Sequence, residues 1–282
     1  MQIKRNLNHM PNLTLNSEFL IRGIGAASGL VYKDNILYLI SDSSTYLYEY
    51  TIIDNKLNKI PLIEDAQENI TKKDKLDFEA IALKENKLHL FASGSKSKRE
   101  KKFTYNIENQ EIKEKNLSEL FNRLKSKYAI TDDDLNIEGV CFGIEKWHLF
   151  QRGNGENNIN GIFCVDNNDK YLIDFYPFEL PKIENINATF TDVILVDDKF
   201  YFLAAAENSS STFNDGEILG SMIGSINAKT FDIDFVQKIS DSQKFEGLTL
   251  YNKTKESLEF LLCEDNDSEI FESTIYKLVL NN

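Results

Sequence analysis

The chain has 282 residues, and 41% of them are apolar, so it can bury a large hydrophobic core. Its formal net charge of −13 at pH 7 argues against wholesale binding to nucleic acid or to an anionic membrane, because both partners select clustered Lys and Arg. The three cysteines form no CxxC pair, the N-terminus lacks the apolar run of a secretory signal, and no stretch approaches the ~18 consecutive apolar residues of a membrane span, so we expect a cytoplasmic protein with free thiols.

Short β-rich runs separated by turn-forming residues predict strands along almost the whole chain. The first run is Leu13–Ile21. Apolar residues at helical spacing predict a helical insert at about residues 117–128. The remaining strands fall into five groups, in chain order: Gly29–Tyr32, Ile36–Ser41, Tyr46–Thr51 and Leu57–Ile63; Glu79–Leu83, Lys87–Ala92, Phe103–Ile107 and Glu111–Lys115; Glu138–Gly143, Lys146–Gln151, Gly161–Val165 and Tyr171–Phe178; Thr191–Val196, Lys199–Ala205, Ser221–Asn227 and Asp232–Ile239; Glu246–Tyr251, Leu258–Cys263 and Thr274–Leu280.

One polar residue recurs at the start of the first strand of each group. This polar series consists of Ser28, Glu79, Glu138, Thr191 and Glu246. Its members lie 51, 59, 53 and 55 residues apart, and self-similarity at such a period indicates a repeat architecture. We predict an all-β, five-bladed β-propeller that forms a single domain over residues 1–282, with the strand at Leu13–Ile21 completing the last blade. A β-sandwich or two stacked barrels are alternatives, but neither explains why the series recurs.

The loops predict which end of the propeller carries the function. In a propeller blade the first strand lines the central channel, and its start shares a face with the loop between the second and third strands. Those loops are long and polar here, at residues 93–102, 152–160, 207–220 and 264–273, whereas the loops between first and second strands are tight. Because long loops on a rigid scaffold commonly carry function, we expect the site at this mouth.

Three carboxylates of the polar series would meet near the propeller axis. They repel one another unless they hold protons or share a cation. Carboxylate and hydroxyl oxygens are hard ligands, which suit Ca²⁺, and less well Mg²⁺, rather than zinc. We therefore predict an axial Ca²⁺ held by all five members of the series. The alternative is a hydrated or protonated polar plug that fills the channel.

The ordered set Ser-Glu-Glu-hydroxyl-Glu resembles the calcium-activated nucleotidase (apyrase) family, whose five-bladed propellers hold one axial calcium through a Ser-Glu-Glu-Ser-Glu set. Four members of the series keep the residue type of that family, and Thr191 replaces a serine. Two further segments, Leu37–Asp42 and Leu258–Asp267, look like blades of the phytase-like esterases and related bacterial propellers, many of which have no known function.

The resemblance implies a metal-dependent hydrolase of phosphate esters or anhydrides, in which the ion polarises a phosphoryl oxygen and orients water. The family has an Asp-Asp-Arg loop and an Arg-Arg pair, for which this chain has Ser41-Asp42-Ser43 and Gln151-Arg152-Gly153. Asp42, which could orient a water or act as a base, and Arg152, a fork-shaped donor, are therefore the candidate catalytic residues.

Other charged residues on the same rim are candidates for binding an anionic small molecule at the mouth. They are Lys96, Lys98 and Arg99 from a basic run, and Glu264 and Asp265 from the last long loop. For the basic run the alternative is a solvated hairpin tip. For the whole protein it is a non-catalytic ligand-binding or protein-binding propeller with a structural axial metal. His89 and His148 occupy equivalent second-strand positions without a third histidine, so we expect structural roles for both.

Overall fold

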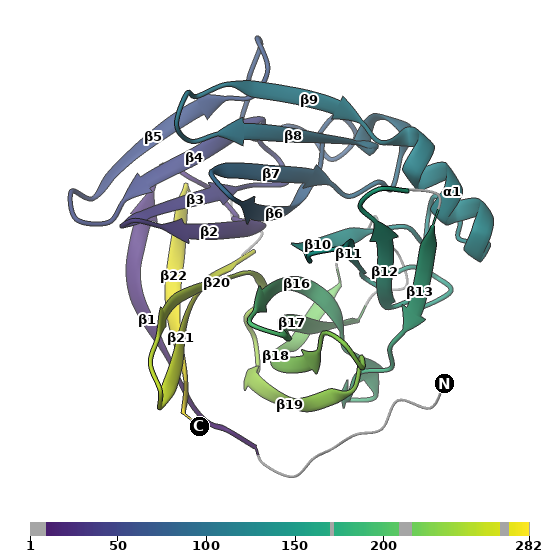
Figure 1. The fold of residues 1–282 in the computed structure, drawn as a ribbon. Helices are drawn as coiled ribbons and strands as arrows, with labels where there is room; N and C mark the ends of the chain where they lie inside the picture. Colours follow the sequence, from purple (N-terminus) through teal and green to yellow (C-terminus); the bar gives the residue numbers. More distant parts are fainter. Residues whose placement is uncertain (1–9, 170–171, 209–215, 266–270, 282) are drawn as a thin grey trace.

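The structure, a computed structural model, describes residues 10–169, 172–208, 216–265 and 271–281. Five four-stranded antiparallel sheets surround a common axis (Figure 1). The strands are, in blade 1, β2 (Gly29–Lys33), β3 (Ile36–Ile40), β4 (Tyr46–Thr51) and β5 (Lys56–Pro61); in blade 2, β6 (Phe78–Lys84), β7 (Lys87–Ala92), β8 (Lys101–Asn106) and β9 (Ile112–Asn116); in blade 3, β10 (Ile137–Phe142), β11 (Lys146–Gln151), β12 (Gly161–Asp166) and β13 (Ile173–Pro177); in blade 4, β16 (Thr189–Val196), β17 (Lys199–Asn208), β18 (Glu217–Asn227) and β19 (Ile233–Ser240); and in blade 5, β20 (Phe245–Lys253), β21 (Ser257–Glu264), β22 (Glu272–Asn281) and β1 (Asn12–Arg22).

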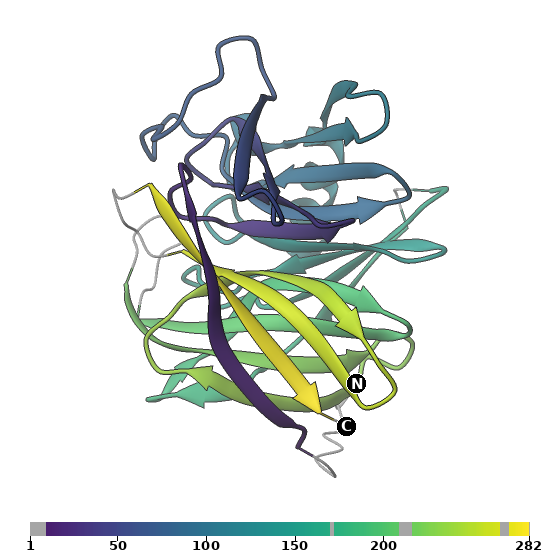
Figure 2. The ribbon, with the colours of Figure 1, turned by 90° about the vertical axis from the view of Figure 1, so that its left-hand side faces the viewer.

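Blade 5 contains strands from both ends of the chain. β1 pairs with β22 from Asn12, opposite Asn281, to Arg22, opposite Glu272. It forms the outer edge of a sheet with the order β1-β22-β21-β20, and Figure 2 shows the two strands side by side. The predicted five-bladed propeller, with an N-terminal strand that completes the last blade, is therefore confirmed.

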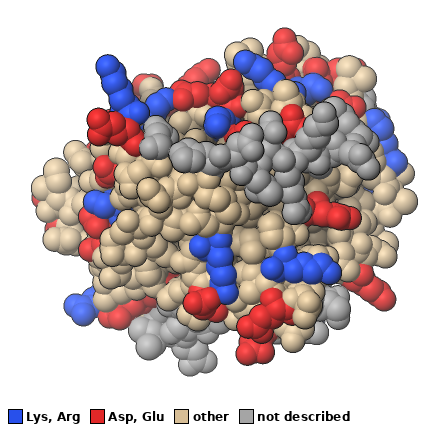
Figure 3. Space-filling model, turned by 90° about the horizontal axis from the view of Figure 1, so that it is seen from below, with Lys and Arg blue, Asp and Glu red and all other residues tan. Residues whose placement is uncertain are grey.

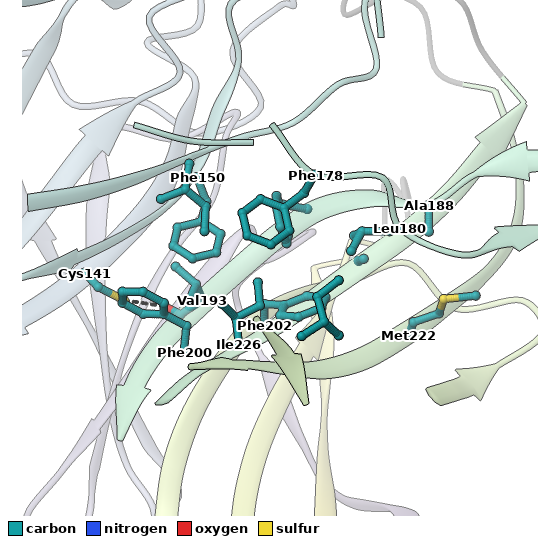
Figure 4. Packing of buried hydrophobic residues seen from close by; sticks show 14 of the residues in the cluster. Cys141, Phe150, Phe178, Leu180, Ala188, Val193, Phe200, Phe202, Met222 and Ile226 are labelled. Atoms are coloured by element: carbon teal, nitrogen blue, oxygen red, sulfur yellow. Dashed lines mark hydrogen bonds between the residues drawn. The ribbon is translucent and has the colours of Figure 1, made fainter. Parts of the chain in front are cut away.

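The hydrophobic core is divided among the interfaces between neighbouring blades. Among the described residues, five clusters of buried apolar side chains lie there, one at each interface. Between blades 3 and 4, for example, the rings of Phe150 and Phe200 pack edge to face with their centroids 5.5 Å apart (Figure 4). Each sheet is thus covered on both faces, which explains why the middle strands are nearly continuous apolar runs in the sequence.

Three smaller features complete the described fold. The predicted helical insert is present as α1 (Ser118–Tyr128), which buries Leu120, Phe121 and Leu124 in the core between blades 2 and 3. A 3₁₀ turn at Ser97–Arg99 and a hairpin of β14 (Lys182–Ile183) and β15 (Ile186–Asn187) were not predicted, because two or three residues give no periodic signal.

The predicted strand at residues 171–178 begins later, as β13, and Tyr171 lies outside the described residues. No helix in the described part of the chain is long and apolar enough to cross a membrane.

Four of the five inner strands carry a β-bulge at the polar series. The register of β6, β10, β16 and β20 shifts at Glu79, Glu138, Thr191 and Glu246, respectively. A bulge leaves its extra residue out of the ladder and changes the direction of its side chain. The sheet backbone, rather than a loop, therefore aims these four side chains.

Candidate metal and ligand site at the propeller axis

A polar cavity of about 490 Å³ lies at the end of the propeller where the inner strands begin. The side chains of Glu79, Glu138 and Glu246 line this cavity together, so the three carboxylates of the polar series converge. Among the described residues, eight acidic and five basic side chains line the wall, an excess of three negative charges. With these side chains ionised, the wall attracts cations.

Burial controls the ionisation of these three carboxyl groups. Glu79, Glu138 and Glu246 are 9%, 2% and 3% exposed. Burial, followed by the charges of Glu138 and Asp77, raises the pKa of Glu79 well above its usual value. Burial also raises the pKa of Glu246 well above its usual value, and it raises the pKa of Glu138 against the opposing effect of Arg152. Each group must hold a proton or face a cation.

Arg152 supplies a fixed cation to one side of the cavity. Its Nη1 lies 3.1 Å from Oε1 of Glu138 and 3.5 Å from Oε1 of Glu246. Its Nη2 lies 2.5 Å from Oε2 of Glu207. The guanidinium group that we predicted would bind substrate is thus surrounded by three carboxylates of the protein itself.

Lys244 extends this chain of ion pairs. Its Nζ lies 2.8 Å from Oε1 of Glu246 and 3.2 Å from Oδ2 of Asp265. The Lys244 side chain is 7% exposed, so water screens these contacts weakly. Two members of the predicted metal-binding series, Glu138 and Glu246, therefore already have positively charged partners.

A second group of charges lies between blades 1 and 2. Lys75 Nζ binds Asp42 and lies 2.8 Å from Oδ1 of Asp77. Oδ2 of Asp77 accepts hydrogen bonds from Arg99 Nη1 at 2.6 Å and from Ser93 Oγ at 2.5 Å. Asp77 has a φ of 64°, in the left-handed region that Asp tolerates better than most residues. This group joins the loop before β6 to the loops after β3 and β7.

Glu79 lies between the two groups and differs from the other acids. It has no hydrogen-bond or ion-pair partner among the described residues. Oε2 of Glu138, whose charge acts on Glu79, is also buried without a hydrogen-bond partner. Oxygens of Asp42, Asp77 and Glu79 lie within 4.8 Å of one another, an arrangement that could hold a metal ion.

The two hydroxyl members of the polar series face their neighbouring blades. Ser28 Oγ donates a hydrogen bond of 2.6 Å to the carbonyl of Phe78, and Thr191 Oγ1 donates one of 2.6 Å to the carbonyl of Phe245. Each accepting carbonyl precedes the glutamate of the next inner strand. Ser28 and Thr191 do not line the cavity in the described part of the chain, so the structure brings together the three carboxylates but not the five side chains.

The remaining candidate residues divide between the cavity wall and the rim. Asp42, Asp265 and Arg99 line the cavity, and Arg99 is 4% exposed and paired with Asp77. Outside the cavity wall, Lys98 Nζ lies 3.9 Å from Asp74, Lys96 precedes the 3₁₀ turn, and Glu264 accepts a hydrogen bond of 2.9 Å from Tyr276. Parts of the long loops at 207–220 and 264–273 lie outside the described residues.

Comparison with known proteins gives a family but not a function. A model of the family of unknown function DUF6929 matches residues 23–280. The chain belongs to this family. A comparison with curated proteins finds no match. Among solved structures, the major Malassezia sympodialis allergen Mala s 1 matches with a TM-score of 0.55 at 9% identity, over 92% of this chain and 95% of the allergen.

Two other solved structures match more weakly. A DUF4221 member from Bacteroides vulgatus has a TM-score of 0.45 at 11% identity, over 99% of this chain and 100% of its own. A luciferin-regenerating enzyme has a TM-score of 0.47 at 11% identity, over 96% of this chain and 98% of its own. These two matches, with TM-scores below 0.5, support no conclusion, and the allergen, at 9% identity, supports the fold alone. None of the three shows a link to calcium-activated nucleotidases or phytase-like propellers, so that resemblance stays a prediction.

In this DUF6929 chain, sequence reasoning missed three residues of the site: Lys75, Asp77 and Lys244. A signal for all three was present. Lys244 lies two residues before Glu246, and Asp77 and Lys75 lie two and four residues before Glu79. Residues two apart in extended chain point to the same side, so each glutamate could have been assigned charged neighbours. The sequence places Glu207 in a long polar loop on the rim, but only the fold brings it to Arg152.

Proposed function

We propose that this protein binds one divalent cation at Asp42, Asp77 and Glu79, on the wall of the axial cavity between blades 1 and 2. The observation that carries the proposal is the lone carboxylate of Glu79, which is buried beside two other acids and lacks a partner among the described residues. Burying an ionised carboxylate without a compensating charge costs roughly several kcal/mol of folding free energy. A cation bound to Glu79 would remove this cost, so we expect it to bind strongly.

The fixed cations argue for this position over the centre of the axis. Arg152 and Lys244 already neutralise Glu138 and Glu246, and a metal bound by all five members of the series would have to displace them. On the other side, Lys75 contacts Asp42 and Asp77, and its charge acts on Glu79 without forming an ion pair. The proposed ion therefore shares two carboxylates with Lys75 and adds a directly contacting charge at Glu79.

The irregular, one-sided set of carboxylates favours Ca²⁺ over Mg²⁺. Ca²⁺ binds oxygen at about 2.3–2.6 Å and accepts irregular shells, whereas Mg²⁺ needs about 2.0–2.1 Å and a regular octahedron. The three ligand oxygens lie within 4.8 Å of one another, close enough to share one Ca²⁺. The remaining positions of such an ion would be filled by water or by a ligand in the cavity.

Two roles for the ion are consistent with this site. Hydrolysis of phosphate esters or anhydrides is favoured by the one-sided ligand set, because an ion held by three carboxylates at a cavity wall keeps open positions for a phosphoryl oxygen and water. A non-catalytic, metal-stabilised binding site is favoured by Arg152, whose guanidinium is already held by Glu138, Glu207 and Glu246. An anionic ligand would bind through the ion in either case.

Calorimetric titration of metal-stripped protein with CaCl₂ and MgCl₂ tests the proposal. We expect one Ca²⁺ site, with binding reduced at least tenfold in Glu79→Gln and Asp42→Asn. Asp74→Asn is the control, because it removes a charge from the same loop, and its side chain is 68% exposed. Unchanged Ca²⁺ binding in Glu79→Gln, or no divalent binding at all, would refute the proposal. If the protein binds no divalent cation, Lys75 alone would neutralise this group of carboxylates.

Phosphate release then separates the two roles. The wild-type protein is incubated with a panel of nucleotides and phosphate monoesters, with and without CaCl₂. Calcium-stimulated release that is lost in Glu79→Gln and kept in Asp74→Asn would support hydrolysis. Calcium binding with no release from any ester would support the binding role.

A further inference from the structure

Lysines gather on the face of blade 2 that is turned towards blade 3. Lys84 on β6 is directly opposite Lys87 on β7, and Lys102 on β8 is directly opposite Lys115 on β9. Like charges at directly opposed positions of antiparallel strands destabilise a sheet. Two such pairs on one blade are a cost that the fold alone does not explain. We call these four residues the lysine cluster.

Lys102 is the most enclosed member of the cluster. It is 7% exposed, and its Nζ lies 3.0 Å from Nδ1 of His89. The same Nζ lies 5.0 Å from the centroid of the Trp147 ring and 5.9 Å from that of Phe142. Lys84 reaches the same place, with its Nζ 5.4 Å from the centroid of Phe142. Two ammonium groups from different strands thus converge on one aromatic ring of blade 3.

Among the described residues, no acidic side chain pairs with the cluster. None of its four ammonium groups makes an ion pair within the part of the chain that the structure describes, whereas the neighbouring Lys101 and Lys113 lie 2.7 and 2.9 Å from Glu114 and Glu111. Figure 3 shows a different side of the molecule, where acidic and basic side chains are interspersed. Aromatic rings compensate a cation by only about 0.5–2 kcal/mol. Positive charge is therefore left over in an otherwise acidic protein.

The titration of the enclosed groups agrees with this excess charge. Burial, followed by Lys115 and Lys84, lowers the pKa of Lys102 to about 8. Burial, followed by Lys102 and Lys84, lowers the pKa of His89 to about 3. An anion beside these groups would reverse the effect of the neighbouring lysines.

We propose that the lysine cluster binds a small oxyanion of the phosphate class beside Phe142 of blade 3, held mainly by the ammonium groups of Lys84 and Lys102. Such an anion offers several acceptor oxygens, so it can accept hydrogen bonds from both groups at once. The neutral His89 keeps the Lys102 amine in position through its Nδ1. This site lies on a different part of blade 2 from the axial carboxylates and does not depend on the proposed metal.

Titration with sodium phosphate, followed by thermal unfolding and by calorimetry at constant ionic strength, tests this site. We expect one phosphate to bind the wild-type protein, and to bind at least fivefold more weakly to Lys84→Met and Lys102→Met. Lys56→Met is the control, because Lys56 is the exposed first residue of β5. Met keeps the length and apolar stem of lysine, and in phosphate-free buffer both cluster variants should melt no lower than the wild type.

A second readout separates binding at the cluster from binding in the axial cavity. Reductive methylation with ¹³C-formaldehyde gives each lysine an NMR signal that reports its own titration. Phosphate should move the titration midpoint of Lys102 upwards by more than that of Lys56. Phosphate binding that stays unchanged in Lys84→Met and Lys102→Met, or a Lys102 midpoint that ignores phosphate, would overturn the proposal.

Discussion

Replacing Arg152 by Met tests whether fixed cations neutralise one side of the axis. The change keeps the volume of the side chain and removes its charge from Glu138, Glu207 and Glu246. The Arg152 side chain is 4% exposed, and those of the three acids are 2%, 7% and 4% exposed. Removing one partner of a buried ion pair costs about 3–5 kcal/mol, because the other charge stays behind without compensation. We expect the free energy of unfolding at pH 7 to fall by about that amount and Tm by roughly 6–15 °C.

The pH dependence of this loss distinguishes lost charge from lost packing. Burial raises the pKa of Glu138 and of Glu246, so without Arg152 their destabilising effect is absent below their unfolded pKa of about 4.3 and grows as the pH rises above it. The deficit of Arg152→Met should therefore be small near pH 4 and largest near pH 7. Denaturant unfolding across this range measures it.

Arg22→Met is the matched control for this experiment. Arg22 Nε lies 2.9 Å from Glu272, a shorter distance than in the Arg152–Glu138 pair, but its side chain is 79% exposed. An exposed pair contributes about 0–1 kcal/mol, so this variant should stay close to the wild type at every pH. A loss below about 1 kcal/mol in Arg152→Met, or a loss that does not depend on pH, would refute the reasoning.

Three further predictions concern the scaffold of the site. Ser28→Ala and Thr191→Val each remove a hydrogen bond to a neighbouring blade and should lower the free energy of unfolding by about 1–2 kcal/mol. Neither change should alter Ca²⁺ affinity. Loss of Ca²⁺ binding in both variants would instead favour an axial ion. Burial, followed by the charge of Lys146, lowers the pKa of His148 to about 4. As the pH falls from 7.5 to 5, this residue should therefore lower the free energy of unfolding by about 2 kcal/mol. In His148→Phe, denaturant unfolding should show a pH dependence that is weaker by that amount. Gly139→Ala would place a Cβ 2.8 Å from Val193 Cγ1 and should cost about 1–3 kcal/mol, whereas Gly25→Ala, with no atom within 4 Å, should be neutral in a thermal unfolding comparison.

The fold could be predicted from the sequence because its signals are local and repeated. Apolar runs and turn residues mark each strand, and the interval between members of the polar series reveals the blade. The ring closure followed from counting, since the last blade had three strands and one strand was left over at the N-terminus. The β14–β15 hairpin was missed because two-residue strands have no period to detect.

The site was predictable only in part, because charge compensation is not local. Glu79, Glu138 and Glu246 come together as their place in the repeat suggests. The directions of Ser28 and Thr191 could not be read from the sequence, because a hydroxyl can rotate towards any nearby acceptor. The carbonyl that accepts from Ser28 lies 50 residues further along the chain, and the one that accepts from Thr191 lies 54 residues further. Arg152 was singled out as a donor to substrate, but the fold places three carboxylates of the protein around it.

The comparison of Glu246 with Glu79 shows what decides whether such a ring needs a metal. Both side chains leave an inner strand at a bulge, and both are buried. Lys244, two residues before Glu246, turns to the same side and pairs with it, whereas the residue two before Glu79 is Asp77, which adds negative charge. For these two glutamates, the residue two positions earlier decides whether a lysine neutralises the carboxylate, whereas Glu138 has Asn136 at that position and is neutralised by Arg152. Blade 2 has Asp77 instead of a lysine two residues before its glutamate, which is why the proposed cation is assigned to Glu79.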